Sequence, residues 1–132
     1  MDPDQPPELP QELRAFLHAC IDSIEQVELL MMLRGSERLR TVREIADALR
    51  ISPAAARREV ETLAARGVFA VSVEEETSYR YRPRSDELAR RCDLLAQYYI
   101  TSRMVIFNFV ATQSRPAVKR FADAFKLRDP EK

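Results

Sequence analysis

Apolar residues recur at helical spacing twice between residues 41 and 69, with a short polar break between the two runs. Side chains three or four positions apart lie on one face of an α-helix, so each run predicts a helix with one buried stripe. The two stripes comprise Val42, Ile45, Ala46 and Leu49, then Ala56, Val60, Leu63 and Ala64. Two short helices with so few residues between them are typical of a helix-turn-helix.

Helix-capping residues stand at the expected ends of both runs. Thr41 and Glu44 have the spacing of a capping box, in which each side chain bonds the backbone N–H of the other residue. Ser52 is placed to cap the second helix, and Pro53 suits its first position, where a missing N–H costs nothing. Gly67 follows the second run, and glycine adopts most easily the left-handed conformation that ends a helix.

The residues after Gly67 change from helical to strand spacing. Residues 68–73 are rich in strand formers, residues 78–82 alternate with period two, and the polar residues 74–77 separate them. Pro83 then stops the second strand, because proline has no N–H to donate to a sheet. The pattern predicts a β-hairpin with a loop of about four residues.

Two further helices are predicted before this region. The first begins at Pro10 and carries the apolar stripe Leu13, Phe16, Leu17, Cys20 and Ile21. The second begins after Ser23, whose spacing from Gln26 matches another capping box, and ends at Gly35. Its run of residues 29–33 leaves no polar face, which favours a central core helix. The alternative is a helix that lines a ligand pocket with its methionines.

A long helix is predicted after the hairpin. Ser85 and the two acidic residues that follow it favour a helix start, and the apolar spacing continues to about Gln113. At about 1.5 Å per residue this helix would exceed roughly 40 Å, more than a small domain covers by itself. Beyond Arg103 it is apolar nearly all round, so a second copy of the chain is the simplest partner. Arg115 and Pro116 end it, and a last helix carries the stripe Val118, Phe121, Ala122 and Phe125.

This order of elements resembles that of the MarR-like winged helix-turn-helix transcription regulators over almost the whole chain. The segment ISPAAARREVETLAARGVF is similar to their recognition helix, with Leu63, Gly67 and Val68 at the usual apolar and glycine positions of the family. The expected fold is therefore mainly α with a small β-hairpin wing. It is a winged helix-turn-helix with flanking N- and C-terminal dimerisation helices.

The expected organisation is a flexible N-terminus over residues 1–8 and a single domain over residues 9–132. Within that domain we assign the helix-turn-helix to residues 41–67, the wing to residues 68–82 and the C-terminal dimerisation helices to residues 85–127. A chain of 132 residues is long enough for one such domain.

The resemblance implies a bacterial, cytoplasmic regulator of transcription. In that family a homodimer places two recognition helices on a palindromic operator in double-stranded DNA. No cofactor or metal is expected, and the sequence leaves open whether a small-molecule effector exists.

The outward face of the second helix of the pair is suited to DNA. Arg57 and Arg58 can bond guanine O6 and N7, and Ala54 and Ala55 can touch thymine methyl groups. The alternative is that the two arginines pair with Glu61 on a solvated face. The predicted DNA-binding residues are Thr41, Arg43, Ser52, Ala54, Ala55, Arg57, Arg58, Glu61, Thr62, Arg80 and Arg82.

The predicted dimer interface combines the apolar residues of the first helix and of the two C-terminal helices. These residues are Leu13, Phe16, Leu17, Tyr99, Val105, Ile106, Phe109, Val110, Phe121 and Phe125.

The formal net charge is zero, but the charge is distributed unevenly along the chain. Residues 1–33 hold seven acidic side chains and one basic, whereas residues 34–84 hold eleven arginines and eight acids. The predicted DNA-binding region is therefore mildly basic, less so than in proteins that bind nucleic acid by charge alone. Family wings usually end in an acid-x-Arg turn, whereas the tip here is Glu74-Glu75-Glu76. Neutrality and this acidic tip support a second hypothesis, a winged-helix module that binds protein and regulates another factor without contacting DNA.

The sequence offers little support for an enzyme. The single histidine, His18, lies opposite the apolar stripe of its helix and has no partner at metal-ligand spacing. No nucleotide-binding glycine motif is present. Cys20 and Cys92 fall on apolar stripes, which favours buried thiols over a redox switch or a disulfide. The most apolar run, residues 104–110, is far shorter than the ~20 residues that a membrane span requires.

Overall fold

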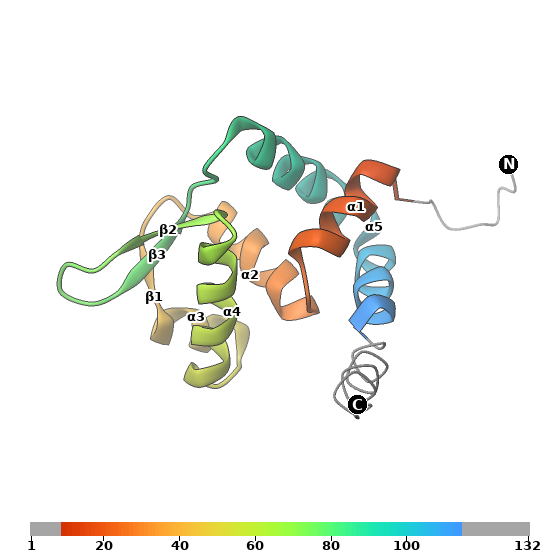
Figure 1. The fold of residues 1–132 in the computed structure, drawn as a ribbon. Helices are drawn as coiled ribbons and strands as arrows, with labels where there is room; N and C mark the ends of the chain where they lie inside the picture. The colour runs from red at the N-terminus through yellow and green to blue at the C-terminus, as the bar shows by residue number, and fades with distance from the viewer. Residues whose placement is uncertain (1–8, 115–132) are drawn as a thin grey trace, which may run out of the picture.

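The computed structural model describes residues 9–114, which form five helices and three short strands. In chain order these are α1 (Gln11–Cys20), α2 (Ile24–Arg34), β1 (Arg40–Thr41), α3 (Val42–Leu49), α4 (Pro53–Ala65), β2 (Phe69–Ser72), β3 (Ser78–Tyr81) and α5 (Asp86–Ser114). Helix α2 lies at the centre and contacts α3, α4, β3 and α5, while α1 packs against α5 (Figure 1). The predicted flexible N-terminus and the predicted last helix, with Phe121 and Phe125, lie outside the described residues.

The helix-turn-helix is confirmed, with the predicted caps at both helix starts. The Thr41 hydroxyl accepts from the Glu44 N–H at 3.1 Å, and the Glu44 carboxylate accepts from the Thr41 N–H at 3.0 Å. Ser52 caps α4 by accepting from the Ala55 N–H at 3.1 Å. Between the helices, Arg50 has a left-handed backbone with φ of 60°. A residue with a Cβ rarely adopts this conformation, so the sequence did not indicate how α3 ends.

Gly67 ends α4 through the paired backbone bonds of a Schellman motif. The Val68 N–H donates to the Leu63 carbonyl at 3.0 Å, and the Gly67 N–H donates to the Ala64 carbonyl at 3.0 Å. Gly67 has φ of 88°, in the left-handed region. This turn directs the chain from α4 straight into the wing.

Replacing Gly67 with Ala is expected to lower the free energy of unfolding by about 1 kcal/mol, because a left-handed alanine costs about 1–2 kcal/mol and a stiffer unfolded chain offsets part of it. An added Cβ would lie 2.5 Å from Cδ of Arg84, which is an exposed side chain able to move. Gly35→Ala is the matched control, since Gly35 has φ of −85° and its nearest neighbour would be 3.6 Å away. Denaturant unfolding should show a loss for Gly67→Ala alone, and equal midpoints would contradict this account of the turn.

The wing forms a three-stranded antiparallel sheet in the order β1-β3-β2. Strands β2 and β3 pair with Phe69 opposite Tyr81 and Ser72 opposite Ser78, which confirms the predicted hairpin. Strand β1 was not predicted, because it has only two residues, Arg40 and Thr41, and so shows no alternation. It joins the start of α3 to the wing and thereby fixes the hairpin against the helix-turn-helix.

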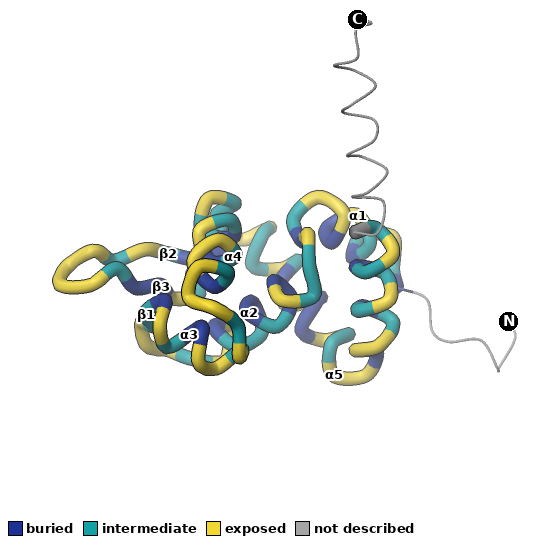
Figure 2. Tube along the Cα trace, turned by 90° about the horizontal axis from the view of Figure 1, so that it is seen from below, coloured by how far each residue is buried: buried dark blue, intermediate teal, exposed yellow. Residues whose placement is uncertain are grey.

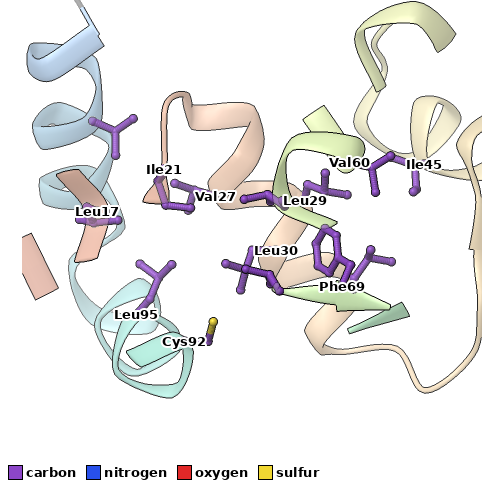
Figure 3. Close-up of a cluster of buried hydrophobic side chains, with 14 of the residues drawn as sticks. Leu17, Ile21, Val27, Leu29, Leu30, Ile45, Val60, Phe69, Cys92 and Leu95 are labelled. Carbon is purple, nitrogen blue, oxygen red and sulfur yellow. The ribbon is translucent and has the colours of Figure 1, made fainter. Parts of the chain in front are cut away.

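The core is continuous from the helix-turn-helix to α1 and α5. Side chains of α2 occupy its middle, including Val27, Leu29 and Leu30, which are fully buried (Figure 3). This confirms α2 as the central core helix. One polar side chain, Gln26, is buried among them at 1% exposure.

Helix α5 is kinked, whereas a straight helix was predicted. Ser102 has a non-helical backbone, with φ of −136° and ψ of 39°, and it is buried. Serine and threonine side chains compete with the helical hydrogen bonds, and here the Thr101 and Ser102 hydroxyls lie 3.4 Å apart. The second half of α5 therefore changes direction, and its Gln113 bonds the backbone at the end of α1.

Several of the predicted dimer residues are buried within the single chain. Because α1 packs on α5, both helices cover part of each other's apolar surface. Five of the predicted interface residues have almost no exposed surface for a partner: Leu13, Phe16, Leu17, Ile106 and Val110. Tyr99, Val105 and Phe109 are half-buried.

Candidate nucleic-acid interface

The outer face of α4 is an open, shallow depression whose lining matches the predicted contact residues. It is lined by Ala54, Arg57, Arg58, Glu61, Thr62 and Ala65. Of these only Ala65 was not predicted. The buried side of the same helix consists of Ala56, Val60 and Leu63, which are fully buried and hold it in place.

The two arginines on this face differ in their partners. Arg57 pairs with Glu61 at 4.0 Å, and both side chains are more than half exposed. Arg58 lies 3.9 Å from Glu59, whose side chain is only 15% exposed. The alternative for this face was that both arginines pair with Glu61, and only Arg57 does so. Exposed pairs of this kind contribute little to stability.

The N-terminal residues of α3 and α4 lie near the surface, as predicted. Arg43 and Ser52 are exposed, while Thr41 is half-buried and uses its hydroxyl in the capping box. Ala54 is exposed and Ala55 is half-buried.

Thr62 differs from the prediction in one respect. Its hydroxyl donates to the Arg58 carbonyl at 2.8 Å, within the same helix. The hydroxyl proton is therefore already used, and only an oxygen lone pair and the methyl group are free for a ligand.

The wing carries both signs of charge at different places. Arg80 is exposed on β3, and Arg82 is exposed just after that strand. The backbone N–H of Arg82 donates to the Val68 carbonyl at 3.0 Å. The loop residues Glu74, Glu75 and Glu76 form an exposed tip that extends away from the body (Figure 2). Next to them, Val71 and Val73 are 50% and 72% exposed, and this exposure was not predicted from the sequence.

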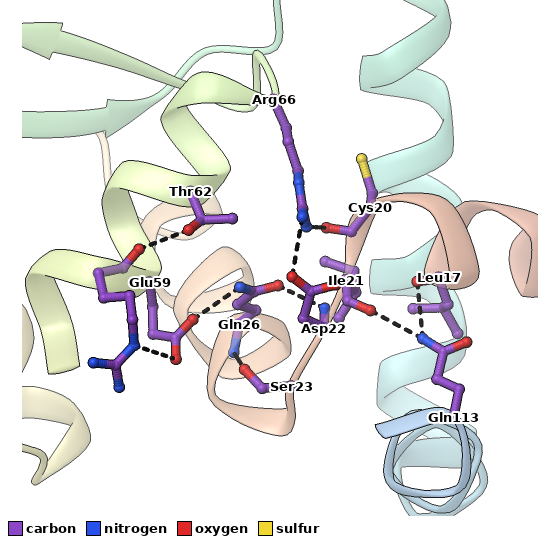
Figure 4. Close-up of polar contacts among 11 residues, drawn as sticks. Leu17, Cys20, Ile21, Asp22, Ser23, Gln26, Glu59, Thr62, Arg66 and Gln113 are labelled. Atoms are coloured by element: carbon purple, nitrogen blue, oxygen red, sulfur yellow. Dashed lines mark hydrogen bonds and ion pairs between the residues drawn. The ribbon is translucent and has the colours of Figure 1, made fainter. Parts of the chain in front are cut away.

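A polar network behind α4 was also missed. Buried Gln26 on α2 accepts from the Asp22 N–H at 2.7 Å and donates to the Glu59 carboxylate at 2.8 Å (Figure 4). The second capping box is therefore only half formed, because Ser23 caps Gln26 but the Gln26 side chain bonds Asp22 instead. A lone glutamine in an apolar helix was the available signal.

Two further contacts hold the turn between α1 and α2 in place. Arg66 at the end of α4 donates to the Cys20 carbonyl at 2.6 Å and pairs with Asp22 at 3.0 Å. Gln113 on α5 donates to the Leu17 and Ile21 carbonyls at 3.1 and 2.9 Å (Figure 4). Helices α4 and α5 are thus both bonded to the same end of α1.

His18 is exposed, as predicted, and its Nδ1 lies 3.2 Å from the Gln113 amide oxygen. Among residues 9–114, no group of three or more His, Cys, Asp or Glu side chains is placed to hold a metal ion. No helix in that range is long and apolar enough to cross a membrane.

Both cysteines are free thiols, and Cys92 is fully buried while Cys20 is half-buried. Burial raises the pKa of Cys92 to about 11 and also raises the pKa of Cys20. Since the thiolate is the reactive form, iodoacetamide at pH 8 should label Cys92 far more slowly than Cys20 in the folded protein. Mass spectrometry of both sites would measure this, with urea-unfolded protein as the control. Equal labelling of both sites in the folded protein would contradict the buried position of Cys92.

No family model matches the sequence, and a search of curated proteins finds no match to it. Solved structures do resemble it. A crystal structure of the adhesin competence repressor AdcR from Streptococcus pyogenes aligns with a TM-score of 0.51 at 17% identity, over 84% of this chain and 82% of AdcR. A second AdcR crystal structure gives 0.50 at 16% identity over 85% of each chain. A structure of Lactococcus lactis ZitR in complex with DNA aligns with a TM-score of 0.44 at 17% identity, over 89% of this chain and 92% of ZitR.

At these identities the similarity to AdcR establishes the fold. The five helices and the small antiparallel sheet described above form a winged helix-turn-helix.

Proposed function

We propose that this chain is a sequence-specific, DNA-binding regulator of transcription of the MarR-like kind, which acts in the cytoplasm as a homodimer on a palindromic operator. The observation that carries the proposal is the outer face of α4, where Arg57 and Arg58 are exposed between small residues on the second helix of a helix-turn-helix. That a protein of the same fold is a repressor supports the proposal.

The chemistry of this face suits the major groove. A guanidinium bonds guanine O6 and N7 with two parallel N–H groups, which gives base discrimination worth about 1–3 kcal/mol. Ala54 is exposed and short, so the helix backbone can approach the bases closely. Arg43 and Ser52 lie at helix N-termini, where phosphates are bound by N–H groups and basic side chains.

A second copy of the chain is the proposed partner of α5. Near the kink, Ile100 is 81% exposed and Met104 is 64% exposed. Beside them Arg103 stacks over the Tyr99 ring at 4.4 Å, and Tyr99 contacts Phe107 edge-on at 6.2 Å. This surface includes Tyr99 from the predicted interface and adds Ile100 and Met104. A self-associating patch of this kind would bring two copies of α4 onto one duplex.

The two wing arginines should contribute to the salt dependence of binding. If Arg80 and Arg82 contact phosphates, replacing both with Ala should reduce the slope of log K against log salt by about 0.9 per lost contact. Fluorescence titrations of duplex DNA between about 50 and 200 mM salt would measure the slope. In the double variant its magnitude should be smaller by roughly 0.9 if one contact is lost and roughly 1.8 if both are. The control is Arg90→Ala, which removes a charge on α5 that pairs with Glu12 away from the wing. An unchanged slope in the double variant would show that the wing does not touch the backbone.

A second candidate function is favoured by the wing tip. Three exposed glutamates would be repelled by phosphates, and the neighbouring Val71 and Val73 expose apolar surface. Both features suit a protein partner better than DNA. Changing Glu74, Glu75 and Glu76 together to Gln tests this alternative. If the tip points away from DNA the affinity should change little, whereas a large gain would show that the tip opposes DNA and would favour the protein-binding function.

A further inference from the structure

We propose that Arg58 is the arginine that distinguishes bases, and that Gln26 and Glu59 are positioning residues which hold it for this role. Arg57, on the same face, is left to make contacts that do not depend on sequence. This inference rests on the proposed DNA-binding function and assigns different roles to two adjacent arginines.

Gln26 is fixed at both ends of its amide group. It is 1% exposed, its oxygen accepts from the Asp22 N–H at 2.7 Å, and its nitrogen donates to Glu59 at 2.8 Å. Because the carboxylate needs a donor and the backbone N–H needs an acceptor, only one orientation of the amide satisfies both. The Glu59 carboxylate is thereby tied to the core through α2.

The fixed Glu59 carboxylate lies next to the Arg58 guanidinium. One carboxylate oxygen is held by Gln26, and the other lies 3.9 Å from Nε of Arg58 (Figure 4). The Arg58 guanidinium therefore has a charged neighbour that cannot move freely, although its own side chain is 68% exposed and accessible to a ligand.

Arg57 has no such neighbour. Its partner Glu61 is itself 55% exposed, their separation is 4.0 Å, and the two side chains can move together. Ordering a mobile arginine on binding costs side-chain conformational entropy. A bidentate bond to guanine demands a set orientation, whereas a phosphate accepts many, so the arginine beside the fixed, largely buried carboxylate is suited to bases and the one beside an exposed carboxylate to phosphates.

Glu59→Gln and Glu87→Gln form a matched pair that tests the assignment. Each removes one negative charge that neighbours an arginine, Arg58 on α4 for Glu59 and Arg91 on α5 for Glu87, and Glu87 lies away from the candidate interface. The measured quantity is the ratio of the affinities for a duplex enriched by the wild-type protein from a random library and for a scrambled duplex of equal composition. Glu59→Gln should lower this ratio about tenfold, within the range that one bidentate base contact supplies. Glu87→Gln should leave it within about twofold, since the exposed pair with Arg91 that it breaks lies on α5 and is worth little.

Gln26→Leu tests the core end of the same chain of contacts. It removes the donor to Glu59 without changing the charge of α4, so a fall in the ratio cannot come from charge. If Gln26 acts on Arg58 only through Glu59, the double variant Gln26→Leu, Glu59→Gln should lower the affinity ratio no further than the more damaging single variant. Circular dichroism and thermal unfolding would confirm that each variant is folded, and Glu59→Gln supplies the answer if Gln26→Leu is not.

Equal effects of Glu59→Gln and Glu87→Gln on the ratio, or a loss confined to Arg57→Ala rather than Arg58→Ala, would overturn the assignment. A wild-type protein that prefers no sequence would instead refute the proposed function itself, and the inference with it.

Discussion

Replacing Arg57 and Arg58 together with Ala is expected to weaken binding to a cognate duplex by at least about 2 kcal/mol, roughly thirtyfold, because a base contact from Arg58 is worth about 1–3 kcal/mol and the charge of Arg57 is lost as well. Both side chains are exposed on α4 and contribute little to the fold, so the variant should unfold at the same denaturant concentration as the wild type. The loss on DNA of random sequence should be smaller, because only charge is lost there.

The matched control for this variant is Arg90→Ala with Arg91→Ala, which removes two adjacent arginines from α5. These pair with Glu12 and Glu87, away from α4. Fluorescence anisotropy on the same duplexes would compare the two double variants. If both lose affinity equally, the protein binds DNA by net charge and α4 has no special role.

The second large effect is expected at the exposed part of α5. Changing Ile100 and Met104 to Asp should convert a dimer to a monomer at micromolar concentration, because each substitution places a charge where apolar surface would be buried at a two-fold axis. At roughly 25 cal/mol per Å² of apolar surface, a few such side chains account for several kcal/mol of association. Since both side chains are exposed in the single chain, the monomer should remain folded.

Sedimentation velocity at micromolar concentration measures this directly. Val73→Asp is the control, because Val73 is equally exposed but lies on the wing. A wild-type protein that sediments as a monomer would contradict the proposed homodimer. A folded Asp variant that still dimerises would place the interface elsewhere on the chain.

The helix-turn-helix could be predicted from sequence because its signals are local. Thr41 with Glu44, Ser52 with Pro53, and Gly67 each act within one helical turn, and each forms the expected cap in the structure. Helix ends are specified by such short-range bonds, so no knowledge of the fold was needed.

The features that were missed depend on contacts between distant residues. Strand β1 exists because Arg40 pairs with Tyr79, almost forty positions later. The kink at Ser102 lies in a segment whose apolar spacing remains helical, so the spacing does not indicate where the chain turns. For the same reason the apolar surplus of α5 was assigned wholly to a dimer, although α1 covers part of it.

At the candidate site, too, local features could be predicted and long-range contacts could not. The outward direction of Arg57 and Arg58 followed from helical periodicity once the buried stripe was known. The different partners of the two arginines did not follow, since the Gln26–Glu59 bond joins residues on separate helices. Of the wing, the exposed arginines were expected, whereas the exposure of Val71 and Val73 depends on how far the hairpin extends beyond the body.

The measurement that tests the central claim most directly is selection of bound fragments from a random duplex library by the purified protein. The proposed function predicts enrichment of a palindrome whose half-sites are about one helical turn, roughly 10 base pairs, apart. The Arg57→Ala, Arg58→Ala variant should enrich it weakly or not at all. A wild-type protein that enriches no sequence after repeated rounds would contradict the claim that α4 reads DNA.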